Sequence, residues 1–430
     1  MTSPVEKYLN LYAENKNLTD KILGIWSALE IPQIAYPICV PVCCESEAFN
    51  FFLKSLIEAV RFIDKPTLLI LNLNEKKTAE YEVSKDNEKF RTFLLSQSIN
   101  FSCDEFCLGK FSDKLFFIAV FAVGKYAFED DQGVGLARKM AQDLALALYN
   151  KNFILSNQVW MSDADVELPY NYLTIQLKPQ SSAGVFAFNH HLHPLQPDDF
   201  HAKQAAQHYD FSLKYYVAGL GFAGSDYAFD AIGSSIVYHQ LSYAQARGLP
   251  KLLAAEDFYF LNKLRKLGPI EQVDEIELSL SPRRSERVPF GTGMSVIKQA
   301  SNLANGNPYL FYNPECFVFL KNWLEYARKA LDHFGEATER LRNVFSMSDS
   351  TFDFLKNKML KARAQIELPK YLVARRKAFE SFFDGFFQLK LIHILRDFDF
   401  QNVNLDTIIK DPRVKKWNYR NQRLIEYDKK

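Results

Sequence analysis

An apolar run ends in three closely spaced carboxylates at residues 159–169, VWMSDADVELP. Asp163, Asp165 and Glu167 fall within five positions, and aspartate is rare inside strands, so we expect a strand to end here. A D-x-D spacing on an extended chain places both carboxylates on the same side. Two such oxygen ligands suit Mg²⁺ or Mn²⁺, completed by phosphate oxygens and water. The alternative is a solvated turn at the end of the strand.

Strands and helices alternate on the N-terminal side of this stretch. Apolar runs of strand length occur at 35–42, 66–74 and 114–124, and helical spacing predicts helices within 1–30, 44–63 and 130–152. Strand, helix and strand in succession are typical of a parallel sheet with crossover helices. We therefore predict an α/β fold with a Rossmann-like mixed, mostly parallel sheet flanked by helices. Such a sheet binds its ligands beyond the carboxyl ends of its strands.

On the C-terminal side of this stretch, the sequence predicts first strands and then mostly helices. Further strands are expected at 172–179 (YLTIQLKP) and 184–188 (GVFAF), helices dominate from about Gln204, and nearly everything beyond Asn307 has helical spacing. We expect a sheet-containing domain over 1–305, opened by a helical segment at 1–30, and a helical C-terminal extension over 306–430.

The composition is that of an ordinary globular protein. Of 430 residues, 48% are hydrophobic and 24% charged, and the formal net charge is +1, which gives no reason to expect nucleic acid as a partner. Six cysteines are few for this length and suit free thiols in a reducing compartment. The N-terminus has no apolar signal region, and no apolar run reaches the ~20 residues of a membrane span. We therefore expect a cytoplasmic protein without a transmembrane segment.

Two other stretches carry charged residues at helix starts. In GVGLARKMAQD, residues 133–143, Gly133 and Gly135 allow a tight turn and Arg138 follows in the first turns of a helix, which is a plausible anion-binding corner or a plain glycine loop. In AAEDFYF, residues 254–260, Glu256 and Asp257 begin an amphipathic helix. They either complement the helix dipole, or Asp257 takes a proton from an attacking hydroxyl.

These stretches, in this order, resemble the GT-A glycosyltransferases of the inverting family-two type, bacterial-like, over about 34–293. The turn PVCCE matches the family's first motif at Pro41 and Glu45, with Cys44 where asparagine is usual. Asn72 stands where the family has an acidic or amide residue that contacts the base. Glu256 and Asp257 match the family's E-D motif, and the segment before them has Gly233 and Ser234 near the sugar position.

The resemblance implies transfer of a sugar from a nucleotide-diphosphate donor to a hydroxyl acceptor, with inversion and with Mn²⁺ or Mg²⁺. Pro41, Glu45, Asn72, Arg138, Asp163, Gly233 and Ser234 would then bind the donor. Asp163 and Asp165 would serve the metal, and Asp257 would be the general base. The sugar, the nucleobase, the acceptor, the third metal ligand and the oligomeric state are not defined by the sequence.

Three residues are candidates for acceptor or phosphate contacts: His190, Glu256 and Arg287. His190 belongs to FNHHLHP, residues 188–194, for which a partly exposed loop, an acceptor pocket and a zinc site are alternatives. Arg287 lies in SPRRSERVPFGTG, residues 281–293, which is similar to a segment of bacterial relatives.

The C-terminal part has a stripe of phenylalanines between 379 and 387. It indicates a helix packed on the core or, alternatively, a membrane-surface or dimerisation helix. Interleaved acidic residues favour packing, so a peripheral membrane contact of this stripe is not expected.

Two other functions compete with glycosyl transfer. A sugar-nucleotide nucleotidyltransferase would need a glycine-rich basic loop after the first strand, which PVCCESEAF lacks. An inactive scaffold would act through a protein partner, and the presence of Asp163, Asp165 and Asp257 together argues against it.

Overall fold

The structure is a computed structural model that describes residues 3–190, 193, 199–282 and 292–427. The chain divides into two compact units, Met1–Ala206 with Ala231–Ile297 and Gln207–Asp230 with Lys298–Lys430. The division falls within two helices, α6 (Phe200–Phe222) and α9 (Thr292–Ala304).

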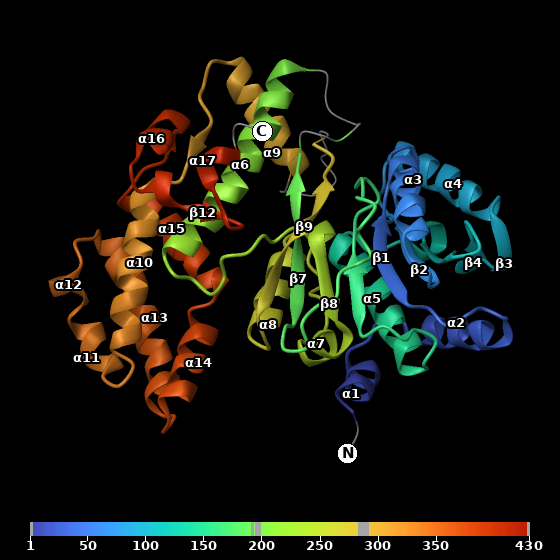
Figure 1. Ribbon diagram of the computed structural model, residues 1–430, viewed down its shortest axis with the longest axis horizontal. Helices are drawn as coiled ribbons and strands as arrows, with labels where there is room; N and C mark the ends of the chain where they lie inside the picture. Colours follow the sequence, from blue (N-terminus) through green and yellow to red (C-terminus); the bar gives the residue numbers. More distant parts are fainter. Residues whose placement is uncertain (1–2, 191–192, 194–198, 283–291, 428–430) are drawn as a thin grey trace. The chain divides into compact units, whose positions relative to one another are not determined.

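The first unit contains a nine-stranded sheet in the order β3-β4-β5-β2-β1-β6-β8-β7-β9 (Figure 1). The strands are β1 (Tyr36–Val42), β2 (Thr67–Asn74), β3 (Ser98–Ser102), β4 (Phe106–Lys110), β5 (Leu115–Ala122), β6 (Gln158–Met161), β7 (Ala183–Asn189), β8 (Ile236–His239) and β9 (Ile270–Ser279). The pairings make only β4 and β8 of these described strands run against the others. The predicted fold class, a mixed and mostly parallel sheet with helices and a helical C-terminal part, is confirmed.

The strand directions bring several chain segments to one edge of the sheet. The parallel strands β5, β2, β1 and β6 all end there. Strand β8 is antiparallel to β6, so β8 begins at the same edge, directly after the short 3₁₀ turn η2 (Gly233–Ser235). The residues after β6 and the residues before β8 are therefore neighbours at this edge.

Helices cover both faces of the sheet. They are α1 (Pro4–Leu11), α2 (Lys16–Ala28), α3 (Ala48–Arg61), α4 (Tyr81–Leu95), α5 (Val134–Asn150), α7 (Gln240–Gln245) and α8 (Glu256–Arg265), with a 3₁₀ turn η1 (Gly124–Tyr126). Phe49 of α3 packs edge-on against Phe90 of α4, with ring centroids 4.8 Å apart, and α5 packs against β1 and β2. Ala122 of β5 joins Leu136 of α5 in one buried cluster.

Three parts of the sheet differ from the sequence-based expectation. Strands β3 and β4 form a hairpin between the strands expected at 66–74 and 114–124, where no strand was expected, and β8 and β9 lie where helices were expected to dominate. The strand expected at 172–179 does not form. Its backbone bonds instead to two side chains: Gln158 accepts from Leu177 N at 2.7 Å and donates to Ile175 O at 3.3 Å, and Glu271 accepts from Lys178 N at 2.8 Å.

A buried polar cluster fastens the first helix to the sheet layer. Asp143 of α5 accepts hydrogen bonds from the hydroxyls of Tyr8 and Tyr243, each at 2.6 Å, and from Glu14 N at 2.8 Å. Lys139 lies one turn before Asp143 and pairs with it at 3.0 Å. Because unpaired buried charge is costly, this cluster fixes the position of α1.

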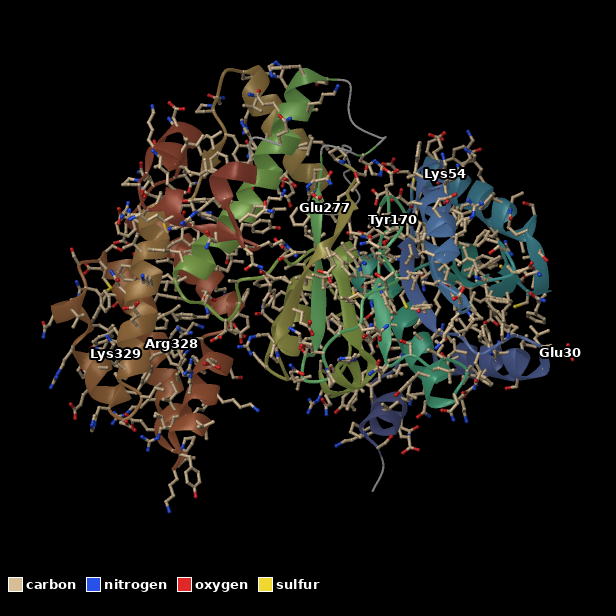
Figure 2. The ribbon with its side chains drawn as sticks, viewed as in Figure 1. Glu30, Lys54, Tyr170, Glu277, Arg328 and Lys329 are labelled. Atoms are coloured by element: carbon tan, nitrogen blue, oxygen red, sulfur yellow. The ribbon has the colours of Figure 1, made fainter. Side chains whose placement is uncertain are left out.

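The second unit is helical and has an aromatic core. Its helices are α10 (Pro314–Lys329), α11 (Phe334–Glu339), α12 (Leu341–Val344), α13 (Asp349–Glu367), α14 (Leu372–Phe382), α15 (Gly385–Phe398), α16 (Leu405–Lys410) and α17 (Leu424–Tyr427). Short pieces complete it: β10 (Leu310–Phe311), β11 (Val403–Asn404), η3 (Val414–Lys416), β12 (Asn418–Tyr419) and β13 (Gln422–Arg423). Arg328 of α10 (Figure 2) donates to Gly224 O at 2.8 Å and so ties the segment after α6 to this unit.

The phenylalanine stripe packs in the core, as its acidic neighbours indicate. Phe379, Phe383 and Phe387 are buried around Trp323. Phe379 lies in α14, Phe383 follows its last residue, and Phe387 lies in α15. Asp384 caps α15 by accepting from the backbone of Phe386 and Phe387. Within the part of the chain that the structure describes, no helix has the length and apolarity needed to cross a bilayer.

We predict that Tyr8→Phe lowers the free energy of unfolding by about 1.5–3 kcal/mol, the usual value of a hydrogen bond to a charged group. The variant removes one of the donors that Asp143 needs. Urea unfolding of the full chain measures the change. Tyr12→Phe is the matched control, because Tyr12 contacts Tyr8 through its ring. Equal stability of the two variants would contradict the prediction.

Candidate active site

Arg138 is the central residue of the candidate site. It lies in the second turn of α5, and its side chain is 5% exposed. Its guanidinium pairs with Asp163 at 2.5 Å and with Glu256 at 2.9 Å, and it donates to Gly233 O at 3.2 Å. Three segments far apart in the sequence, after β6, before β8 and at the start of α8, thus meet at one buried cation.

Two glycines permit these close approaches. A Cβ atom on Gly233 would lie 2.5 Å from Nη2 of Arg138, and a Cβ on Gly135 would lie 2.4 Å from Leu252 O. The Gly135 amide donates to that same carbonyl at 3.1 Å. This amide at the start of α5 is therefore used by the segment that leads into α8, and the glycines here serve packing.

The acidic residues of α8 occupy its first turn, where the helix dipole favours carboxylates. Ala255 precedes them in the left-handed conformation (φ 61°) and gives no side-chain cap. Asp257 Oδ1 accepts from Phe258 N at 2.7 Å. Glu256 is buried and pairs with Arg138, and its expected contact with an acceptor or phosphate stays a prediction.

The site has more carboxylates than cations, because Asp163, Glu256 and Asp257 surround the single guanidinium of Arg138. Burial would lower the pKa of Arg138, but Asp163, Glu256 and Asp257 together raise it above its usual value. Burial raises the pKa of Asp257 to about 7, the charge of Glu256 adds to the rise, and Arg138 opposes it. Asp257 can therefore hold or release a proton near neutral pH, which is the property of a general acid or base.

The stretch after β6 leaves the sheet in a turn. Strand β6 ends at Met161, two residues before the first aspartate, and Ala164 and Asp165 form a turn. Asp163 and Asp165 are partly exposed, whereas Ala164 is buried. Glu167 then exchanges backbone hydrogen bonds with Ser279 at the end of β9. The expected end of the strand at the aspartates is observed, and Glu167 joins the bridge to Ser279 through its backbone.

The residues expected at the nucleotide lie on neighbouring strands of the same sheet. Pro41 of β1 is opposite Asn72 of β2. Asn72 is fully buried, with its amide 3.8 Å from the sulfur of Met140 in α5. Glu45 is buried just before α3. The structure thus places Asn72 beneath a helix, and whether these residues contact a base stays a prediction.

A polar cluster that the sequence did not reveal lies at the ends of β1 and β2. Asn87 of α4 donates to Asn74 O at 3.1 Å and accepts from Cys44 N at 3.0 Å. Glu75 accepts from Gly124 N at 2.9 Å. The only available signal was the polar pair Asn74 and Glu75 at the end of the second strand, because Asn87 lies in a helix of ordinary composition.

Of the histidine and arginine candidates for acceptor or phosphate contacts, only His190 lies among the described residues. His190 is buried directly after β7, with its ring 5.5 Å from that of Phe188. Strand β7 ends at the same edge as β6 but extends farther. Ser234 is buried in η2 beside Gly233. Arg287 lies outside the described residues.

A cavity of about 330 Å³ lies elsewhere in this unit. It is lined by residues at the end of β5, by Leu136 and Met140 of α5 and by Leu18 of α2. Strands β2 and β1 separate β5 from β6, so this cavity is not the acidic site.

The aspartates after β6 are candidate ligands of a metal ion whose other ligands would come from a substrate and from water. Among the described residues, no group of three or more His, Cys, Asp or Glu side chains could hold a metal ion. Mg²⁺ is often bound by one or two carboxylates together with substrate phosphates and water. Asp163 and Asp165 supply two carboxylates of this kind, and their binding of a metal stays a prediction, whereas a zinc centre built from described protein ligands alone is not supported.

We predict that Asp257→Asn changes how stability depends on pH. An unfolded aspartate releases its proton near 3.8, whereas Asp257 keeps its proton up to about 7. Between these values the unfolded state binds fewer protons, so the stability that protonated Asp257 contributes is full below about pH 4 and is lost as the pH rises through about 7. The variant should therefore gain stability relative to the wild type across this range.

Urea unfolding at several pH values measures this difference. Asp20→Asn, at an exposed position of α2, is the matched control and should follow the wild type. Parallel pH profiles for Asp257→Asn and the wild type would contradict the prediction.

The chain is similar to several solved structures. No protein-family model and no curated protein matches the chain. The crystal structure of S. aureus TarS residues 1–349 in complex with UDP-GlcNAc is 12% identical to the chain over an alignment that covers 81% of this chain and 92% of that chain, with a TM-score of 0.38. At that TM-score the likeness supports no conclusion about this chain.

Proposed function

We propose that the chain is a metal-dependent glycosyltransferase that moves a sugar from a nucleotide-diphosphate donor to a hydroxyl acceptor with inversion. The observation that carries the proposal is the meeting of Asp163, Glu256 and Asp257 around Arg138 at the carboxyl edge of the sheet. Ligands of open α/β sheets bind beyond this edge.

The two aspartates after β6 are the residues that would hold a divalent cation. A bound Mg²⁺ or Mn²⁺ would neutralise charge on the departing nucleotide diphosphate. Asp165 is partly exposed in the turn. Asp163 shares its carboxylate with Arg138, which holds it in one orientation. We assign the metal chiefly to Asp165 and the alignment of the turn to Asp163.

Asp257 is the residue that we propose as the general base. Its pKa of about 7 suits the removal of a proton from an acceptor hydroxyl at neutral pH. Attack by that hydroxyl on the face of the sugar opposite the diphosphate would invert the anomeric centre. Glu256, next to Asp257 in the chain, pairs with Arg138, and its negative charge adds to the rise in the pKa of Asp257.

Arg138 acts in this proposal as a positioning residue. Its buried guanidinium already contacts two carboxylates and a carbonyl. Its role is therefore to hold Asp163 and the first turn of α8 in register, whereas the sequence alone suggested a contact with the diphosphate.

We predict that the full chain binds at least one of a panel of UDP-, GDP- and dTDP-sugars in a Mn²⁺-dependent manner. Thermal stabilisation and slow donor hydrolysis are the measurements. Asp165→Ala should reduce the Mn²⁺-dependent stabilisation, because it removes a ligand. The absence of any stabilisation across the panel, with and without metal, would overturn the proposal.

Asp257→Asn provides the contrast in the same assay. It should retain Mn²⁺-dependent donor binding and lose transfer and hydrolysis by about 10²-fold or more, the usual contribution of a general base. Unchanged turnover would remove Asp257 as the base. Donor binding by the wild type without turnover of any sugar would favour the inactive scaffold instead.

A further inference from the structure

An exposed apolar turn lies between α13 and α14 of the second unit. Four side chains of this turn and of the start of α14 are largely exposed: Leu368 at 87%, Tyr371 at 72%, Leu372 at 59% and Val373 at 81%. We call residues 368–377 the α13–α14 tip. Figure 1 shows the turn at one end of this helical unit. Contiguous exposed apolar side chains mark a contact surface.

The α13–α14 tip is distinct from the phenylalanine stripe between 379 and 387, for which we expected no membrane contact. The stripe phenylalanines Phe379 and Phe383 point into the core around Trp323. The tip side chains belong to the preceding turn and to the first turn of α14. The side chains there are exposed and do not pack in the core of the unit. Their exposure therefore needs a separate explanation.

The charge around the tip is basic. No Asp or Glu occurs between Leu368 and Phe379, whereas Lys370, Arg375, Arg376 and Lys377 do. Arg375 pairs with Asp332 and Arg376 pairs with Glu380. Lys370 and Lys377 are exposed and have no ion-pair partner among the residues that the structure describes. The two arginines are thus neutralised, and two lysines remain to meet an anionic partner.

We propose that the α13–α14 tip docks on a bilayer surface that contains anionic phospholipids. Apolar side chains at the end of a helical hairpin can enter the acyl boundary without a shaped pocket on the partner. The flanking lysines would lie at the level of the anionic headgroups, where each contributes about a fivefold gain in binding. This proposal does not depend on the proposed glycosyl transfer.

Co-sedimentation of the full chain with vesicles tests the proposal. Binding should be present with vesicles of phosphatidylcholine and phosphatidylglycerol, weaker with phosphatidylcholine alone, and reduced by added salt, because salt screens the lysines. Absence of sedimentation with the mixed vesicles would overturn the proposal.

Two double variants separate the charged and apolar contributions. Lys370→Gln with Lys377→Gln should lower partitioning about 25-fold, and Leu372→Ser with Val373→Ser should lower it at least about tenfold. The matched controls are Lys329→Gln with Lys415→Gln, at exposed positions (Lys329 is labelled in Figure 2), and Leu310→Ser with Val344→Ser. Both controls should bind as the wild type does.

Two outcomes identify other occupants and would overturn the lipid assignment. Equal loss of binding in the control variants would show that the contact is not made by the tip. Self-association in light scattering that disappears in Leu372→Ser with Val373→Ser would assign the tip to a second copy of the chain. Melting temperatures equal to that of the wild type establish that each variant is folded.

Discussion

The candidate site depends on one buried guanidinium that is shared by two carboxylates. Arg138 is almost completely removed from water, so its charge requires Asp163 and Glu256. Removing one partner of such a buried pair typically costs about 3–5 kcal/mol. The pairing also links an aspartate turn to the first turn of a helix, and in this way one interaction sets the positions of both groups of acidic residues.

The topology of the sheet makes this interaction possible. Strand β8 runs against β6, so η2 reaches the edge at which β6 ends. Gly233 then accepts a hydrogen bond from Arg138 at a distance that a larger residue would prevent. Gly135 allows the start of α5 to touch the segment before α8. Burial, together with the charge of Glu256, raises the pKa of Asp257 to about 7.

The fold was predictable where whole strands are buried. Strands β1, β2 and β5 are mostly apolar, and such runs stand out in a sequence. Strand β9 was missed because only Val273, Ile276 and Leu278 of it are strongly buried at the edge of the sheet, and charged residues separate them. Strand β8 was missed because it is only four residues long.

The candidate site was predictable in its residue types but not in its pairings. The positions of Asp163, Asp165 and Asp257 at a strand end and a helix start were visible in the sequence. The partnership of Arg138 with Glu256 was not, because 118 residues separate them. Local patterns carry no information about such contacts, which only the packing of α5 and α8 creates.

The most direct test of the central claim is a crystal of the full chain soaked with Mn²⁺ and a nucleoside diphosphate, examined by the anomalous signal of manganese. Our account predicts a manganese peak next to Asp165, shared with the diphosphate, and Arg138 still bonded to Asp163 and Glu256. A peak at another place, or bound nucleotide that leaves these aspartates without metal, would contradict it.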